Sequence, residues 1–138
     1  MPKNEIIRFT KPLLKLLDPV LDNDEACGIT RLRDQKQIAI SDKFSEILGT
    51  TQAIATGRNM KMGWNPAHLD ECNRRIRSED RFTLTYESAF NPQQYGRMTA
   101  EILLIDDGVE QYRFNVNQGW DLLDSFPEEM RILQRFDW

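Results

Sequence analysis

From residue 81 onward, apolar and polar side chains alternate with a period of two. In the segment RFTLTYESAF, residues 81–90, the apolar positions are Phe82, Leu84, Tyr86 and Phe90. This alternation is typical of a strand that buries one face. Two more strands are predicted at residues 95–105 and 109–120, and the Asp106-Asp107-Gly108 sequence between them indicates a hairpin. The three strands therefore form an antiparallel meander, and its apolar faces need helices as cover.

The chain ahead of the meander predicts two short strands and three short helices. The strands are CGITRLR from Cys27 and KQIAIS from Lys36. Capping signals mark two of the helices: Ser41 precedes DKFSEILG, and Asn65-Pro66 begins a helix that reaches to about Arg77. Between them, TQAIATG predicts another short helix that ends at a glycine. Because strands and helices are segregated along the chain, we expect an α+β fold with an antiparallel sheet.

Apolar segments flank this body at both ends. A helix is predicted at residues 11–21, and a short helix at residues 127–136 follows Pro127. We therefore divide the chain into an N-terminal flanking helix (residues 1–25), a central domain (26–123) and a C-terminal helical tail (124–138). The exposed apolar residues expected to form an interface with a second copy or a partner are Leu13, Leu16, Leu17, Trp120, Phe136 and Trp138.

Length and charge exclude several classes of protein. The 138 residues are 40% hydrophobic and 29% charged, which indicates one soluble globular domain. A net charge of −4 and a pI near 5.1 argue against nucleic-acid binding. No apolar run approaches the ~20 residues that span a bilayer. Without a signal peptide, and with Cys27 and Cys72 far apart, we expect a cytoplasmic protein with reduced thiols.

The succession of elements resembles the PAS (Per-Arnt-Sim) domain family over residues 26–122. IAISDKFSEILG resembles the second strand and first helix of that family, and GRNMKMGWNPAHLDECNRRI resembles the segment in which a proline begins the long helix. YGRMTAEILLIDDGVEQYRFNV resembles the final hairpin. The resemblance implies a five-stranded antiparallel sheet of order 2-1-5-4-3 with helices on one face. It also implies a small cavity under the helices, and a role in sensing a ligand or pairing with partners.

The same resemblance raises the question of a flavin. Light-oxygen-voltage domains, a PAS branch, carry G-x-N-C-R-F-L-Q where this chain has GRNMKMGW. Gly57 and Asn59 match that pattern. Met60 occupies the position of the reactive cysteine in that motif. Its thioether is not a nucleophile that could form a flavin adduct. We therefore predict no flavin.

Haem, zinc and catalysis are also not expected. His68 is the only histidine and lies in the first turn of a predicted helix, where it is more often a solvent-facing residue than an iron ligand. One histidine and two separated cysteines do not make a zinc site. The chain has no catalytic motif, although Asp121 or His68 could serve a small α+β enzyme if buried in an apolar pocket. We expect a protein that is not an enzyme and needs no cofactor.

The predicted function is that of a stand-alone sensory and signal-transduction domain, a homodimer that regulates through a small apolar ligand or a signalling partner. The residues that could line the ligand cavity, or equally fill a plain core, are Met60, Met62, Trp64, Leu69, Tyr86 and Phe114. The alternatives are a ligand-free dimerisation or adaptor domain and, less favoured, a small α+β enzyme.

Overall fold

A computed structural model of the chain describes residues 24–91 and 93–128. The predicted flanking helix, with Leu13, Leu16 and Leu17, lies outside the described residues, as do Phe136 and Trp138. The strands are β1 (Cys27–Arg31), β2 (Lys36–Ile40), β3 (Arg81–Asn91), β4 (Gln94–Asp106) and β5 (Gln111–Leu122). The helices are α2 (Asp42–Leu48), α3 (Gln52–Ala55), the 3-10 turn η1 (Met60–Met62) and α4 (Pro66–Glu79).

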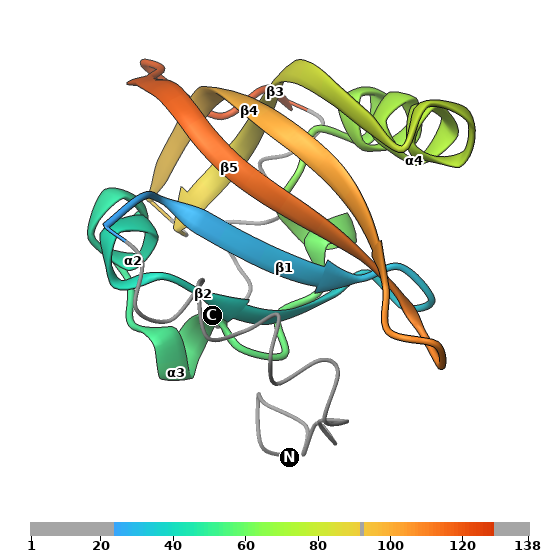
Figure 1. Cartoon of the computed structure of the whole chain (residues 1–138). Coiled ribbons are helices and arrows are strands. Elements are labelled where there is room, and N and C mark those ends of the chain that lie inside the picture. Colours follow the sequence, from blue (N-terminus) through green and yellow to red (C-terminus); the bar gives the residue numbers. More distant parts are fainter. Residues whose placement is uncertain (1–23, 92, 129–138) are drawn as a thin grey trace.

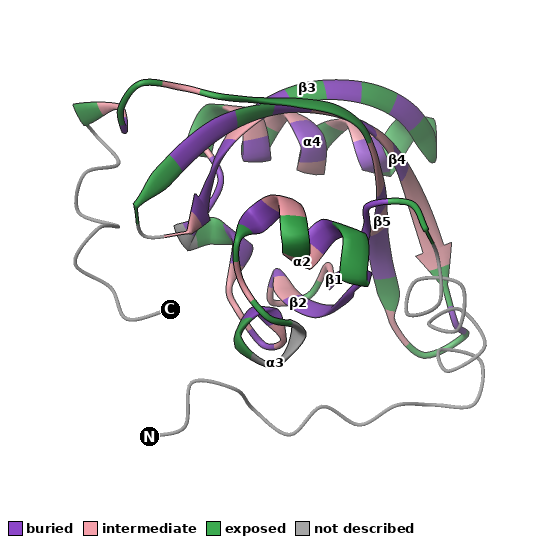
Figure 2. Cartoon of the chain, turned by 90° about the vertical axis from the view of Figure 1, so that its left-hand side faces the viewer, coloured by how far each residue is buried: buried purple, intermediate pink, exposed green. Residues whose placement is uncertain are grey.

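All five strands join one antiparallel sheet of order β2-β1-β5-β4-β3. The predicted α+β fold and strand order are confirmed. The sheet is curved, and α2 and α4 lie on its concave side (Figures 1 and 2). The largest cluster of buried apolar side chains lies there and includes Phe44, Leu69, Ile76, Leu84 and Ile102.

Local signals in the sequence set the helix ends. The Ser41 hydroxyl accepts a hydrogen bond from the Phe44 amide at the start of α2, and Gly49 ends that helix with φ +68°. At α4, the Asn65 side chain accepts from the Ala67 amide and Pro66 occupies the first turn. These are the caps that the sequence predicts.

The start of α4 is joined to β3 by a histidine. His68 Nδ1 accepts a hydrogen bond from the Glu87 amide at 2.9 Å, and the Asn65 amide donates to the Glu87 carbonyl at 2.8 Å. An imidazole nitrogen that accepts a hydrogen bond carries no proton. His68 is half-buried, and its hydrogen bond to the Glu87 amide holds α4 against the sheet. We had expected this side chain to face the solvent.

The segment after β5 packs on the convex side of the β3–β4 hairpin. Phe126 is 4% exposed, and its ring lies 5.3 Å from that of Tyr95. Ala89 belongs to the same cluster, with Leu123 against it. The described part of the predicted tail thus packs on its own domain.

Candidate functional site

The central strand β5 turns polar side chains toward the helices. Arg113 and Asn115 pair with Thr30 and Gly28 of β1, and all four lie on the concave side. Phe114, between them in sequence, joins the cluster of Ile29 and Tyr112 on the opposite side of the sheet. The prediction that Phe114 lines the cavity is therefore wrong in placement. Strand residues alternate between faces, so a buried Phe114 face puts Arg113 and Asn115 under the helices.

Arg113 is fully buried, with 0% of its surface exposed. One of its terminal nitrogens, Nη1, donates to Gln35 Oε1 at 2.8 Å and to Asn73 Oδ1 at 3.3 Å. Gln35 lies in the turn between β1 and β2, and Asn73 lies in the middle of α4. A single guanidinium thus links the sheet, a hairpin turn and the long helix.

The other edge of this guanidinium is formed by Nε and Nη2. Nε and Nη2 of Arg113 are buried, and neither makes a hydrogen bond to any residue of the described ranges. The guanidinium carbon lies 4.8 Å from the ring centre of Trp64, and Trp64 stacks on Tyr86 with the two ring centres 3.7 Å apart. The guanidinium therefore rests on an aromatic pair, with two donors directed at neither a carbonyl nor a carboxylate.

Burial also sets the charge of this region. It lowers the pKa of Arg113 below its usual value, and the nearby Cys72 and Tyr86 side chains oppose that shift. Neither of these is a carboxyl group. Burial raises the pKa of Tyr86 to about 12, so its hydroxyl stays protonated at neutral pH and donates to Met98 Sδ at 3.3 Å.

A small cavity adjoins these residues between the sheet and the helices. Its volume is about 20 Å³, enough for one water molecule. Polar side chains in its lining come from β1, β2, β3, β5 and the segment before η1: Thr30, Gln37, Arg58, Ser88 and Asn115. Asn115 Oδ1 is buried without a hydrogen-bond partner in the described part of the chain. Burial lowers the pKa of Arg58 to about 9, a second sign of a desolvated cation.

The predicted cavity residues fall into three groups. Met60, Trp64 and Tyr86 line the cavity together. Leu69 is buried in the core but does not line it. Met62 lies in η1, and its side chain is outside the described part. Arg58 and Arg113 were not predicted as site residues, although the alternation of Arg113 and Asn115 with Tyr112 and Phe114 could have indicated an inward polar face.

A surface groove leads to the same guanidinium from outside. It measures about 690 Å³ and is lined by residues of both hairpin turns, η1 and α4, among them Gln35, Lys61, Asn73 and Arg77. Because Gln35 and Asn73 are also the two acceptors for Arg113 Nη1, they separate this groove from the buried charge. Arg33 and Glu110, also in the lining, pair at 3.0 Å.

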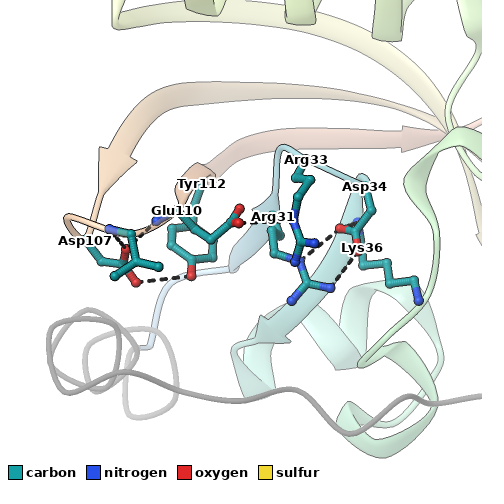
Figure 3. Close-up of polar contacts among 8 residues, drawn as sticks. Arg31, Arg33, Asp34, Lys36, Asp107, Glu110 and Tyr112 are labelled. Carbon is teal, nitrogen blue, oxygen red and sulfur yellow. Dashed lines mark hydrogen bonds and ion pairs between the residues drawn. The ribbon is translucent and has the colours of Figure 1, made fainter.

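Polar contacts fasten the two hairpin turns that form one wall of the groove (Figure 3). Arg31 donates to both carboxylate oxygens of Asp34, at 3.0 and 2.6 Å. Asp107 Oδ1 accepts from the Val109 and Glu110 amides. The Tyr112 hydroxyl donates to Asp107 Oδ2 at 3.2 Å. These contacts shape each turn from within, and the Arg33–Glu110 ion pair joins the two turns.

The tyrosine in this network predicts an alkaline weakening of the fold. Burial first, and then the Asp107 carboxylate, raise the pKa of Tyr112 from about 10 to about 12. Between these values the unfolded chain loses the proton and the native chain keeps it, so stability falls as pH rises from 10 to 12. Tyr112→Phe removes this dependence. In urea unfolding, the stability advantage of the wild type over Tyr112→Phe should be smaller at pH 11 than at pH 8; an equal difference at both would contradict the assignment.

Comparison with known proteins gives the fold from structure alone. No protein-family model and no curated protein matches the sequence. A PAS domain of a two-component sensor histidine kinase superposes with a TM-score of 0.63 at 8% identity, covering 76% of this chain and 93% of that one. The PAS domain of an HTR-like protein from Haloarcula marismortui gives 0.59 at 9% identity, covering 76% and 94%. The chain has the PAS fold.

A third structure with this fold is the light-oxygen-voltage protein of Rhodobacter sphaeroides. Its TM-score is 0.64 at 9% identity, covering 87% of this chain and 71% of that one. At the position that the light-oxygen-voltage motif gives to cysteine, this chain has Met60, which is 4% exposed and packed in the core. Asn59, which matches the motif, caps η1 by accepting from the Lys61 amide. Both residues thus have structural roles in this chain.

Among the described residues, no group of three or more His, Cys, Asp or Glu side chains could hold a metal ion. No helix within the described ranges is long and apolar enough to cross a bilayer. Cys27 and Cys72 are both buried free thiols. Burial raises the pKa of Cys27 to about 11 and raises that of Cys72, so both are protonated at neutral pH.

Of the predicted interface residues, only Trp120 is described. It is 43% exposed at the far end of β5, with its ring 5.8 Å from that of Phe90. Leu122, two residues on, is 47% exposed. Trp120 also lines an open groove of about 930 Å³ with Phe114 and Val116. The homodimer and the signalling partner stay predictions.

Proposed function

We propose that this chain is a sensory signal-transduction domain that responds to a small ligand bound between its sheet and its helices. One observation carries the proposal: the centre of the domain holds buried polar atoms whose hydrogen bonds are not made by the described residues. These are Nε and Nη2 of Arg113 and Oδ1 of Asn115. A buried polar atom without a partner costs free energy, about 1–3 kcal/mol, and more for a charged group. A bound ligand would remove that cost.

The same contacts suggest how binding would be transmitted. Arg113 is joined to α4 through Asn73, to the β1–β2 turn through Gln35, and to the segment before α4 through Trp64. A ligand that engages Arg113 acts on all three at once. It would favour one packing of α4 and the turn over another, which is a shift between two populations.

The second candidate is an adaptor that binds no ligand. The exposed Trp120 and Leu122 side chains at the end of β5 favour it, because exposed large apolar residues often mark contact surfaces. A small α+β enzyme has less support. Asp121 is exposed in β5, away from the cavity, and His68 is engaged with the Glu87 amide.

Native and denaturing mass spectrometry of the freshly purified full chain, with an absorption spectrum, tests the proposal. We expect an extra mass that disappears on denaturation. If the site loses its ligand during purification, a library of small neutral, anionic and cationic metabolites should include compounds that raise the melting temperature. Asn115→Leu should abolish the response by filling the cavity, and Gln118→Leu, an exposed change on the same strand, should keep it. A clean mass with no stabilising compound in any class would favour the adaptor.

A further inference from the structure

We infer that the ligand is a short carboxylate, held in two hydrogen bonds by the Nε and Nη2 atoms of Arg113 and carrying a hydroxyl that donates to Asn115 Oδ1. The inference rests on the proposed function and adds the chemical class of the ligand. It follows from which donors are unpartnered, from the absence of a compensating carboxyl among the described neighbours, and from the size of the cavity.

The unpartnered donors are the right pair for a carboxylate. In a guanidinium group, the N–H of Nε and one N–H of Nη2 lie on the same edge and point in parallel. Nη1 is not part of this edge, because it lies on the same side of the Nε–Cζ bond as Cδ. A carboxylate accepts both parallel bonds at once, and this fork geometry is the strongest that arginine offers. Here Nη1 is already engaged with Gln35 and Asn73, and the Nε–Nη2 edge is left for another acceptor. A single neutral acceptor would leave one of these donors unsatisfied.

The charge of the region also calls for an anion. Arg113 is completely buried, and its neighbours that bear on its charge are a thiol and a phenol, Cys72 and Tyr86. Burying a cation without a counter-ion is costly, and a bound anion offsets that cost. A ligand that brings a further positive charge would be disfavoured, which favours a hydroxyl over an ammonium as the second group.

The second group is indicated by Asn115. Its Oδ1 is an acceptor without a partner in the described part of the chain, so it would receive a hydrogen bond from the ligand. Arg113 and Asn115 point to the same face, two residues apart, and their Cα atoms are therefore separated by roughly 7 Å. A molecule of a few carbon atoms reaches both side chains. The cavity of about 20 Å³ is lined by Asn115 and not by Arg113, so it must widen toward Arg113 even for such a ligand, and a long chain or a ring system would require a larger rearrangement.

The surface groove beside Gln35 and Asn73 is the route by which an anion would reach the Nε–Nη2 edge of Arg113. Lys61 and Arg77 line it and are exposed, so they attract anions from solution. Gln35 and Asn73 at its inner end would have to turn aside. Gln35 has a positive φ of 58°, uncommon for a residue other than glycine, and its side-chain amide donates to the Leu32 carbonyl at 3.0 Å. The amide pair thus separates the groove from the guanidinium, and its movement would open the site.

The experiment compares closely related probes on the full chain by calorimetry and melting temperature. Lactate carries both groups, acetate lacks the hydroxyl, lactamide lacks the charge, and alanine replaces the hydroxyl with an ammonium. We expect lactate to bind tightest and lactamide to bind about 100-fold more weakly, because the paired hydrogen bonds from a guanidinium to a carboxylate are stronger than those to a neutral amide. Inorganic phosphate, an anion of another shape, should not replace lactate.

Variants assign the binding to the guanidinium edge. Arg113→Met should abolish the lactate response, and Arg113→Lys, which keeps the charge without the fork, should weaken it about tenfold or more. Arg97→Met, an exposed arginine on the neighbouring strand β4, should leave lactate binding unchanged. If Arg113→Met does not fold, the Arg113→Lys comparison decides.

The outcomes separate this inference from the function on which it rests. If lactamide or another neutral compound binds the wild type and Arg113→Met equally, the ligand class is wrong and the sensory proposal stands. The same conclusion follows if phosphate binds and no carboxylate does. If no compound of any class binds and the purified protein has a clean mass, both the ligand class and the sensory proposal fail.

Discussion

Arg113→Met is expected to make the ligand-free protein more stable, by about 1–4 kcal/mol in free energy of unfolding. Methionine has a similar length and needs no hydrogen bonds, and Arg113 lies among Trp64, Tyr86 and Cys72, which suit an apolar side chain. The change removes two unpartnered buried donors and a desolvated charge. Gln35 and Asn73 lose an interaction, but both also line the surface groove, where water can replace it. Urea unfolding at pH 7 measures the effect.

A stabilising substitution at the centre of a domain would be a sign that the native residue serves binding. Functional sites commonly hold residues that lower the stability of the fold. Arg97→Met is the matched control, because it removes an exposed guanidinium from the next strand and should change stability by less than about 0.5 kcal/mol. If Arg113→Met instead destabilises the protein by about 3 kcal/mol, the bonds to Gln35 and Asn73 and the contact with Trp64 outweigh the cost of burial, and Arg113 is a structural residue.

Local signals explain why the architecture could be predicted. The caps Ser41 and Asn65, the terminating Gly49 and the two-residue alternation in β3 each depend on residues close together in the chain. The helix predicted to run from Asn65-Pro66 to about Arg77 is found at Pro66–Glu79. Strand order follows less directly, because it depends on long-range pairing. It came from the resemblance to the PAS family.

The face of β5 shows where sequence reasoning stops. Alternation tells that Tyr112 and Phe114 share a side, but it does not tell which side of the sheet the helices cover. In a strand that buries only one side, the apolar side is the one expected to face the helices. β5 is a central strand, with neighbours β1 and β4, and both of its sides carry buried residues. The apolar side therefore lies opposite the helices, and the polar side faces them.

Some residues of the candidate site could be named from the sequence, and others could not because their burial depends on tertiary packing. Met60 and Trp64 belong to a segment that resembles the PAS family, Tyr86 belongs to a strand predicted from alternation, and all three line the cavity. Arg58 follows the turn at Gly57, a position where an arginine is normally solvated. Only the packing of α3 and η1 beside β2 buries its guanidinium atoms. Such burial depends on tertiary contacts, which no periodicity in one sequence reveals.

Gly96→Ala is expected to destabilise the protein by roughly 3 kcal/mol, because overpacking a filled core forces neighbours to move. Gly96 lies in β4, paired with Ser88 of β3 and Leu122 of β5. A Cβ atom there would lie 2.5 Å from Phe90 Cζ and 2.7 Å from the Asp121 carbonyl oxygen. Phe90 is fully buried and the carbonyl is backbone, so neither neighbour can move without disturbing the sheet. Thermal and urea unfolding should both show the loss.

Gly119→Ala is the matched control for this prediction. Gly119 lies on the adjacent strand β5, and an added Cβ there meets no atom within 4 Å. Alanine also has less conformational entropy than glycine in the unfolded chain, so less entropy is lost on folding. This variant should therefore be as stable as the wild type or slightly more stable. A large loss of stability in Gly96→Ala alone would show that Phe90 packs too closely on the backbone at Gly96 to leave room for a Cβ atom. Equal losses at both positions would show instead that glycine is needed in these strands for its backbone freedom, and that the packing of Phe90 is not what selects it.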